Sequence, residues 1–102
     1  MNHFTDDTGY KAIGSQPEWC FKAKQPPCDH PKAAYFTTLG PKEPNLAARL
    51  RISRAKVAFV FQFVDQGDLK ALRGDRGEYI FYAEDDYLVT KDRQTHKGAT
   101  GL

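Results

Sequence analysis

Three short segments of this sequence carry side chains that could act together on a polar ligand. His3 lies near the amino terminus, Tyr35 and Phe36 are adjacent in an apolar segment, and Glu78 directly precedes another apolar segment. Taken alone, each has an ordinary explanation: a surface histidine, a core aromatic and a solvated carboxylate. The informative feature is the ordered series, because imidazole, aromatic and carboxylate groups together can bind and polarise a substrate.

The series resembles the His-Tyr-Glu branch of the ADP-ribosyltransferases, which includes poly(ADP-ribose) polymerases and diphtheria toxin. The matching segments are His-Phe-Thr at 3–5, Tyr-Phe-Thr at 35–37 and Glu-Tyr-Ile-Phe-Tyr at 78–82. The most similar members are small toxin domains named for a His-Tyr-Asp signature. Two features depart from the pattern: residues 30–34 read His-Pro-Lys-Ala-Ala instead of containing Gly-x-Gly, and the third motif offers a Glu.

The resemblance implies an enzyme that uses NAD as its substrate and requires no metal. Glu78 would stabilise the positive charge that builds on the ribose as nicotinamide leaves. At about 4 Å and an effective dielectric constant near ~20, this attraction is on the order of 4 kcal/mol, or roughly 10³ in rate. His3 would hydrogen-bond the adenosine ribose, and Tyr35 would stack on the nicotinamide ring. The backbone of Phe4 would hold the nicotinamide amide, with Thr5 assisting.

Further candidates extend this site. Asp86 is the rival of Glu78 as the catalytic acid, because the His-Tyr-Asp name calls for an Asp and this one leads into a strand. The resemblance also implies that Phe36 is a second cofactor-binding aromatic. Arg76 stands close before Glu78 and suits a pyrophosphate, since a guanidinium group binds phosphate through two parallel hydrogen bonds.

A second basic cluster precedes the most apolar strand and comprises Arg49, Arg51, Arg54 and Lys56. A solvated face, a pyrophosphate clamp and a surface for RNA or an acidic protein are all open readings of it. Cys20, Cys28 and His30 form a Cys-x7-Cys-x-His pattern, which is wider than most zinc motifs. We expect two unpaired thiols in a Pro-rich loop, with a disulfide as the alternative.

The apolar patterns predict the elements that must position these residues. Alternation predicts strands over residues 2–4, 19–23, 33–39, 56–64, 78–82 and 87–90. A helix is expected from the Thr5 cap to Gly14, with Tyr10 and Ile13 facing the core, and another from Pro44. The polar tail from Lys91 is expected to fray or to wrap the surface. This order predicts an α+β fold with mixed or antiparallel sheets and few short helices; the resemblance narrows it to an ADP-ribosyltransferase-like fold.

Length and composition are those of one small globular domain spanning residues 1–102. The chain has 102 residues, a formal net charge of +2 and a 40% hydrophobic share, which excludes collagen and wholly disordered chains. We predict neither a signal peptide nor a membrane span, since no apolar run approaches about 20 residues. The expected place of action is the cytoplasm or a target cell.

These observations lead to one functional hypothesis and its rivals. The first is a mono-ADP-ribosyltransferase, toxin-like or effector-like, that modifies a macromolecule, expected to be a protein, and acts as a monomer. The second is an NAD glycohydrolase that releases nicotinamide without modifying an acceptor. The third is a non-enzymatic module that binds RNA or an acidic protein, with an RNA 2′-phosphotransferase as a related variant.

Overall fold

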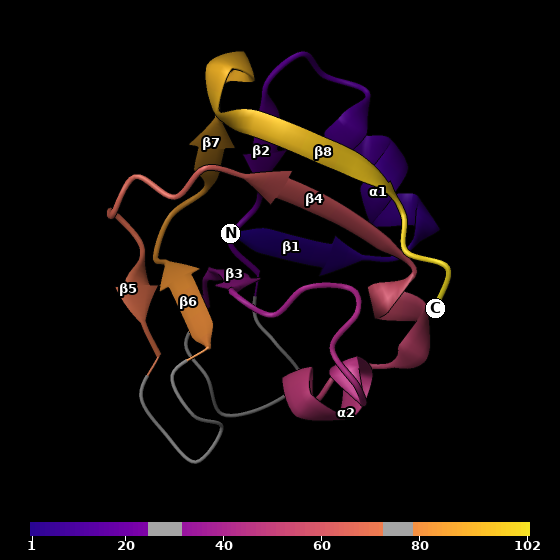
Figure 1. Cartoon of the computed structure of the whole chain (residues 1–102). Coiled ribbons are helices and arrows are strands. Elements are labelled where there is room, and N and C mark those ends of the chain that lie inside the picture. The colour runs from indigo at the N-terminus through magenta and orange to yellow at the C-terminus, as the bar shows by residue number, and fades with distance from the viewer. Residues whose placement is uncertain (25–31, 73–78) are drawn as a thin grey trace.

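The computed structural model describes residues 1–24, 32–72 and 79–102 (Figure 1). In chain order the elements are β1 (Asn2–Thr5), α1 (Asp7–Gly14), β2 (Trp19–Phe21), β3 (Ala34–Thr37), α2 (Leu46–Leu50), η1 (Arg54–Val57), β4 (Phe59–Phe63), β5 (Lys70–Ala71), β6 (Ile80–Ala83), β7 (Tyr87–Val89), η2 (Lys91–Arg93) and β8 (Gln94–Ala99). The two η elements are single turns of 3₁₀ helix. The predicted α+β class is confirmed.

The strands form two antiparallel sheets. Six strands follow the order β5-β6-β3-β1-β4-β8, and β2 pairs with β7 in a separate two-stranded sheet. Strands β1 and β4 run side by side with His3 opposite Phe61, while β3 and β6 pair with Phe36 opposite Phe81. Neighbouring strands of the large sheet therefore come from distant parts of the chain.

Side chains alternate between the two faces of the large sheet along each strand. Both faces are covered by other elements and carry buried residues. One face carries an aromatic cluster that β2 and β7 cover: Trp19, Phe21, Ala34, Phe36, Phe61, Phe63, Tyr87 and Val89. The other face packs against α2 and η1 through Phe4, Leu46, Leu50, Val57, Val60 and Ile80. We call these the aromatic cluster and the helix-side cluster. Tyr10 and Ile13 of α1 pack against the aromatic cluster, as predicted.

The start of α1 differs from the prediction. Its cap is Asp6, whose Oδ1 accepts a hydrogen bond from the Gly9 N–H at 2.8 Å. Thr5 stays in the sheet opposite Phe59, because a residue committed to a strand ladder cannot also cap the next helix. Both residues are good caps, so the sequence alone did not decide between them.

Two other elements also differ from the predictions. The strand predicted from Lys56 starts at Phe59, because Val57 turns away in η1 and packs in the helix-side cluster. The tail from Lys91, predicted to fray or to wrap the surface, contains β8, which pairs along β4 (Figure 1). An exposed edge strand contacts the sheet mainly through its backbone, so its polar side chains resemble those of a tail.

Candidate functional site

The segments that were singled out in the sequence lie on three adjacent strands. Residues 3–5 belong to β1, residues 35–37 to β3 and residues 80–82 to β6, and the sheet order is β6-β3-β1. Glu78 and Arg76, which were also predicted as site residues, lie outside the described residues. The fold thus gathers segments that are about 30 to 75 residues apart into one half of a single sheet.

Strands β1 and β3 separate soon after they meet. Within the described part of the chain, their ladder is recorded at one position, Asn2 opposite Thr37. Met1 exchanges both backbone hydrogen bonds with Phe63 of β4, at 2.8 and 3.0 Å. Because antiparallel residues bond alternately to one side and the other, the N–H and C=O groups of Asn2 and Phe4 point toward β3. Those of Phe4 therefore face the place where the ladder stops, which we call the split.

His3 bridges this split. Its Nδ1 lies 2.9 Å from the carbonyl oxygen of Tyr35. The Thr38 N–H bonds to Tyr79, on the β6 side. Because bonding alternates along a strand, the backbone groups of Tyr35 point to the other side, toward β1. A carbonyl can only accept, so Nδ1 carries the hydrogen and donates. The imidazole packs against the rings of Phe21 and Phe36, with centroids 4.6 and 5.6 Å away. A side chain thus makes the link that the backbone ladder would otherwise supply.

The environment of His3 determines its protonation state. Burial lowers the pKa of the imidazole to about 4; the Tyr35 carbonyl opposes this shift in part, while the nearby charges of Lys24 and Lys56 add to it. At neutral pH the ring is therefore uncharged, with its proton on Nδ1. Nε2 then carries a lone pair and accepts hydrogen bonds, so it suits a hydroxyl donor rather than an anion.

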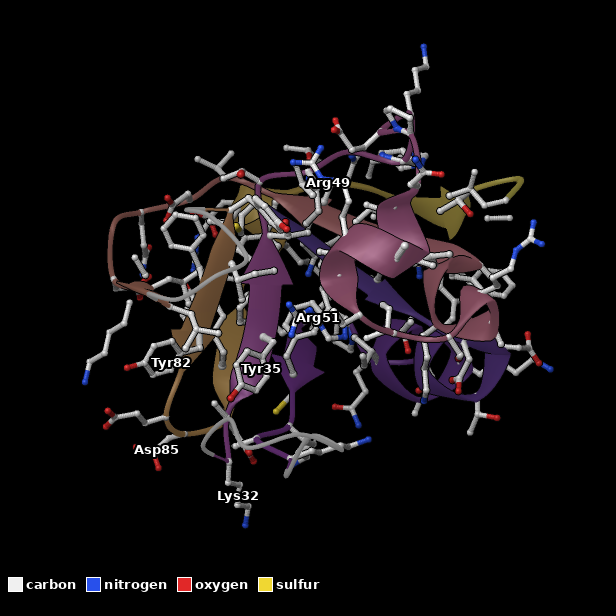
Figure 2. All side chains as sticks on the ribbon, turned by 90° about the horizontal axis from the view of Figure 1, so that it is seen from below. Lys32, Tyr35, Arg49, Arg51, Tyr82 and Asp85 are labelled. Carbon is white, nitrogen blue, oxygen red and sulfur yellow. The ribbon has the colours of Figure 1, made fainter. Side chains whose placement is uncertain are left out.

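Tyr35 places its ring on the other face of the sheet. The ring packs against the helix-side cluster and lies 6.3 Å from the ring of Tyr82, its partner across β3 and β6. Figure 2 shows the two tyrosines together on the face seen from below. The backbones of His3 and Tyr35 meet at the split, but their rings point to opposite faces.

Phe36 and Thr5 point into packed surroundings. The Phe36 side chain is 2% exposed and contacts the rings of Phe21, Phe63 and Tyr87. The buried Thr5 hydroxyl lies directly against Gly9 of α1, where any Cβ would collide with it. Access of a ligand to either side chain would require repacking, and the backbone groups of Thr5 and Phe36 face β4 and β6 within the sheet.

Asp86 has local partners that explain its position. It accepts hydrogen bonds from the Ala23 N–H at 2.8 Å and from Lys22 Nζ at 3.3 Å, which hold its pKa below the usual range. These contacts fasten the turn between β6 and β7 to the chain after β2. Asp86 also lines an open, polar hollow of about 500 Å³ with Ala23, Lys32, Glu84 and Asp85.

Sequence reasoning missed the contacts that depend on strand adjacency. The His3–Tyr35 hydrogen bond requires β1 beside β3, and the Tyr35–Tyr82 ring pair requires β3 beside β6. No local pattern encodes either adjacency. The only available signal was the motif order itself, since a resemblance that places three motifs in one site also predicts that their strands are close.

Other predicted features are only partly described. Cys20 is a half-buried free thiol, while Cys28 and His30 lie outside the described residues. Over residues 1–24, 32–72 and 79–102, no group of three or more His, Cys, Asp or Glu side chains is placed to hold a metal ion. None of the helices in those same ranges has the length and apolar character needed to cross a membrane.

Comparison with known proteins yields no match to a family model, to a curated protein or to a solved structure. The evidence for function is therefore the sequence series together with the geometry of the split.

Proposed function

We propose that this protein is an ADP-ribosyltransferase that binds NAD at the split between β1 and β3 and transfers ADP-ribose to a macromolecule. The finer fold assignment, an ADP-ribosyltransferase-like fold, is part of this proposal. The observation that carries it is the bridge across the split, with His3 Nδ1 bound to the Tyr35 carbonyl and the Phe4 backbone directed toward the same place.

Each group has a physical role that suits its environment. Neutral His3 offers Nε2 as an acceptor for a ribose hydroxyl, and its fixed tautomer avoids reorganisation on binding. The Phe4 N–H and C=O are a donor and an acceptor side by side, the complement of a primary carboxamide such as that of nicotinamide. Tyr35 supplies a ring on the helix side of the split for stacking on the nicotinamide.

The reaction itself breaks the bond between the ribose anomeric carbon and the nicotinamide nitrogen. The bonding electrons leave with nicotinamide, which becomes neutral, and positive charge develops on the ribose. Glu78 is the predicted carboxylate that stabilises this charge. An acceptor oxygen or nitrogen then forms the new bond to the anomeric carbon and loses its proton to the surrounding base or water.

Incubation of the protein with NAD labelled in its adenylate half, in a cell lysate, tests this function. The proposal predicts that free nicotinamide and a labelled macromolecule appear together, and that Glu78→Gln abolishes both. Mass analysis of the labelled material would identify the acceptor. Nicotinamide release without any labelled acceptor would instead favour the glycohydrolase, and an unchanged NAD pool would contradict the enzyme proposal.

A further inference from the structure

One backbone conformation in the helix-side region is unusual for the residue that adopts it. Arg51 follows α2 with φ at 55°, in the left-handed region. Its N–H and that of Ile52 bond back to the carbonyls of Ala48 and Ala47, at 3.2 and 3.0 Å. Glycine is the residue favoured at such a helix end, because a side chain is strained there. An arginine at this position is therefore conformationally unfavourable.

Asn45, at the other end of α2, also has a left-handed backbone conformation and can be compared with Arg51. Asn45 precedes α2 with φ at 57°, but asparagine tolerates the left-handed region well. The same helix thus has one left-handed residue of an expected type and one of an unexpected type. Strained residues of unexpected type are frequent at functional sites, which directs attention to the Arg51 side chain.

The position of Arg51 places that side chain near the split. It directly follows Leu50, which is buried in the helix-side cluster with Phe4, the cluster against which Tyr35 packs. Arg51 is exposed, and Figure 2 shows it next to Tyr35 on the face seen from below. The left-handed turn thus projects a guanidinium group beside the ring proposed to stack on nicotinamide.

The neighbouring cations Arg49 and Lys56 each have a carboxylate partner. Arg49 forms an ion pair with Glu43 and lies over the ring of Tyr79, 5.0 Å from its centroid, so its guanidinium is engaged in holding α2 on the sheet. Lys56 pairs with Asp6 at 2.8 Å. Lys24 and Lys56 both lie near enough to His3 to affect its charge. These two lysines thus bring positive charge near His3 from separate parts of the chain.

We infer that Arg51 binds the pyrophosphate of NAD through its guanidinium group, an inference that rests on the proposed function. A planar guanidinium matches two phosphate oxygens at once, whereas an ammonium acts as a point charge. The pyrophosphate carries the two negative charges of the dinucleotide and connects the ribose near His3 to the ribose near Tyr35. Arg51 is a positioning residue in this scheme and takes no part in bond cleavage.

The test compares Arg51→Gly with Asn45→Gly, which relieve left-handed strain at the two ends of the same helix. Isothermal titration with NAD should show about ten- to hundredfold weaker binding to Arg51→Gly, the range expected for loss of a charged hydrogen-bonding group. Asn45→Gly should bind NAD within about twofold of wild type. Both variants should keep a cooperative thermal transition, because glycine is suited to both positions.

A conservative variant and two small-molecule probes test whether the loss of NAD binding comes from contact between the Arg51 guanidinium and the pyrophosphate. Arg51→Lys keeps the charge but loses the planar group, so it should show a smaller loss, about three- to tenfold. Inorganic pyrophosphate should compete with NAD for wild type but much less for Arg51→Gly. Nicotinamide alone should bind the wild type and both Arg51 variants equally.

The outcomes separate this inference from the function on which it rests. NAD binding that is unaffected in Arg51→Gly and Arg51→Lys would overturn the role of Arg51 and leave the enzyme proposal standing. An equal loss in Asn45→Gly would attribute the effect to the helix conformation and would also overturn it. Failure of the wild type to bind NAD at millimolar concentration would overturn both.

Discussion

The two faces of the six-stranded sheet differ in how the residues around the split are packed and exposed. On one face, which we call the enclosed face, half-buried His3 packs against an aromatic cluster that includes the fully buried Phe21. On the other face, which we call the open face, Tyr35 and Tyr82 keep partly exposed rings, and Arg51 is exposed beside Tyr35 (Figure 2). Under the proposed function, the enclosed face would hold His3 in place for a ribose hydroxyl, and the open face would receive the nicotinamide and the pyrophosphate.

Its packing should make the enclosed face the more rigid of the two. Phe21 contacts the rings of Trp19, Phe36, Phe61 and Phe63, and edge-to-face pairs among buried aromatics add to the energy of burial. The helix side rests on a five-residue helix and one 3₁₀ turn. Short helices draw their stability from tertiary contacts, so this side can adjust more easily when a ligand binds.

Truncation of one aromatic on each face should give the largest contrast in stability. Phe21→Ala removes a fully buried ring and should lower the free energy of unfolding by about 3–5 kcal/mol. Tyr35→Ala should cost about 1–2 kcal/mol, because its ring is partly exposed, yet it should weaken NAD binding. Urea denaturation and NAD titration measure the two effects. Equal destabilisation by both changes would contradict the division between the faces.

The next comparison is between the two candidate catalytic acids, Glu78 and Asp86. Glu78→Gln should lose on the order of 10³ in turnover with little loss of NAD binding, as expected when an interaction is made mainly in the transition state. Asp86→Asn should retain activity, because the Asp86 carboxylate already serves the Ala23 N–H and Lys22. Rates of nicotinamide release, measured on folded variants, decide the assignment. A dead Asp86→Asn beside an active Glu78→Gln would reverse it, and activity in both would refute the mechanism.

Acid should lower the free energy of unfolding through protonation of His3. The folded-state pKa of about 4 lies below the ordinary value of 6.5, so between these limits the unfolded chain takes up a proton that the folded protein does not. The contribution of His3 to the free energy of unfolding should therefore be constant above about pH 6.5 and fall toward pH 4. After allowance for the partial exposure of His3, we expect a loss of about 2 kcal/mol.

His3→Asn is the matched control for this pH dependence. Its amide can still donate to the Tyr35 carbonyl, but it does not titrate. The difference between wild type and variant in urea denaturation, followed from pH 7 to pH 4, isolates the contribution of His3. Identical pH profiles would show that the imidazole is not held uncharged by burial.

The extent to which the sequence predicted this molecule differs between core and site. Strands such as β2 and β7 were predictable because their buried residues alternate with more exposed ones. β8 was not, because a polar edge strand has no apolar alternation to detect. The cap of α1 was placed one residue early because Thr5 and Asp6 are both suitable caps.

The geometry of the site could not be predicted from sequence, because it depends on which strands lie next to each other. The sequence supplied the residues His3 and Tyr35, but their opposite ring directions follow from the register of three strands. The strain at Arg51 follows from where α2 ends, one residue after the buried Leu50. Glu78 and Arg76 remain predictions from sequence, since they lie outside the described residues.

The central claim, that NAD binds at the split against a neutral His3, is tested most directly by nitrogen NMR of the His3 imidazole. At pH 7 the free protein should show a neutral ring with the proton on Nδ1, bound to the Tyr35 carbonyl. Saturating NAD should shift the Nε2 resonance as it accepts a ribose hydroxyl, while Nδ1 stays protonated. A charged ring at pH 7, or an Nε2 resonance that does not respond to NAD, would contradict the account.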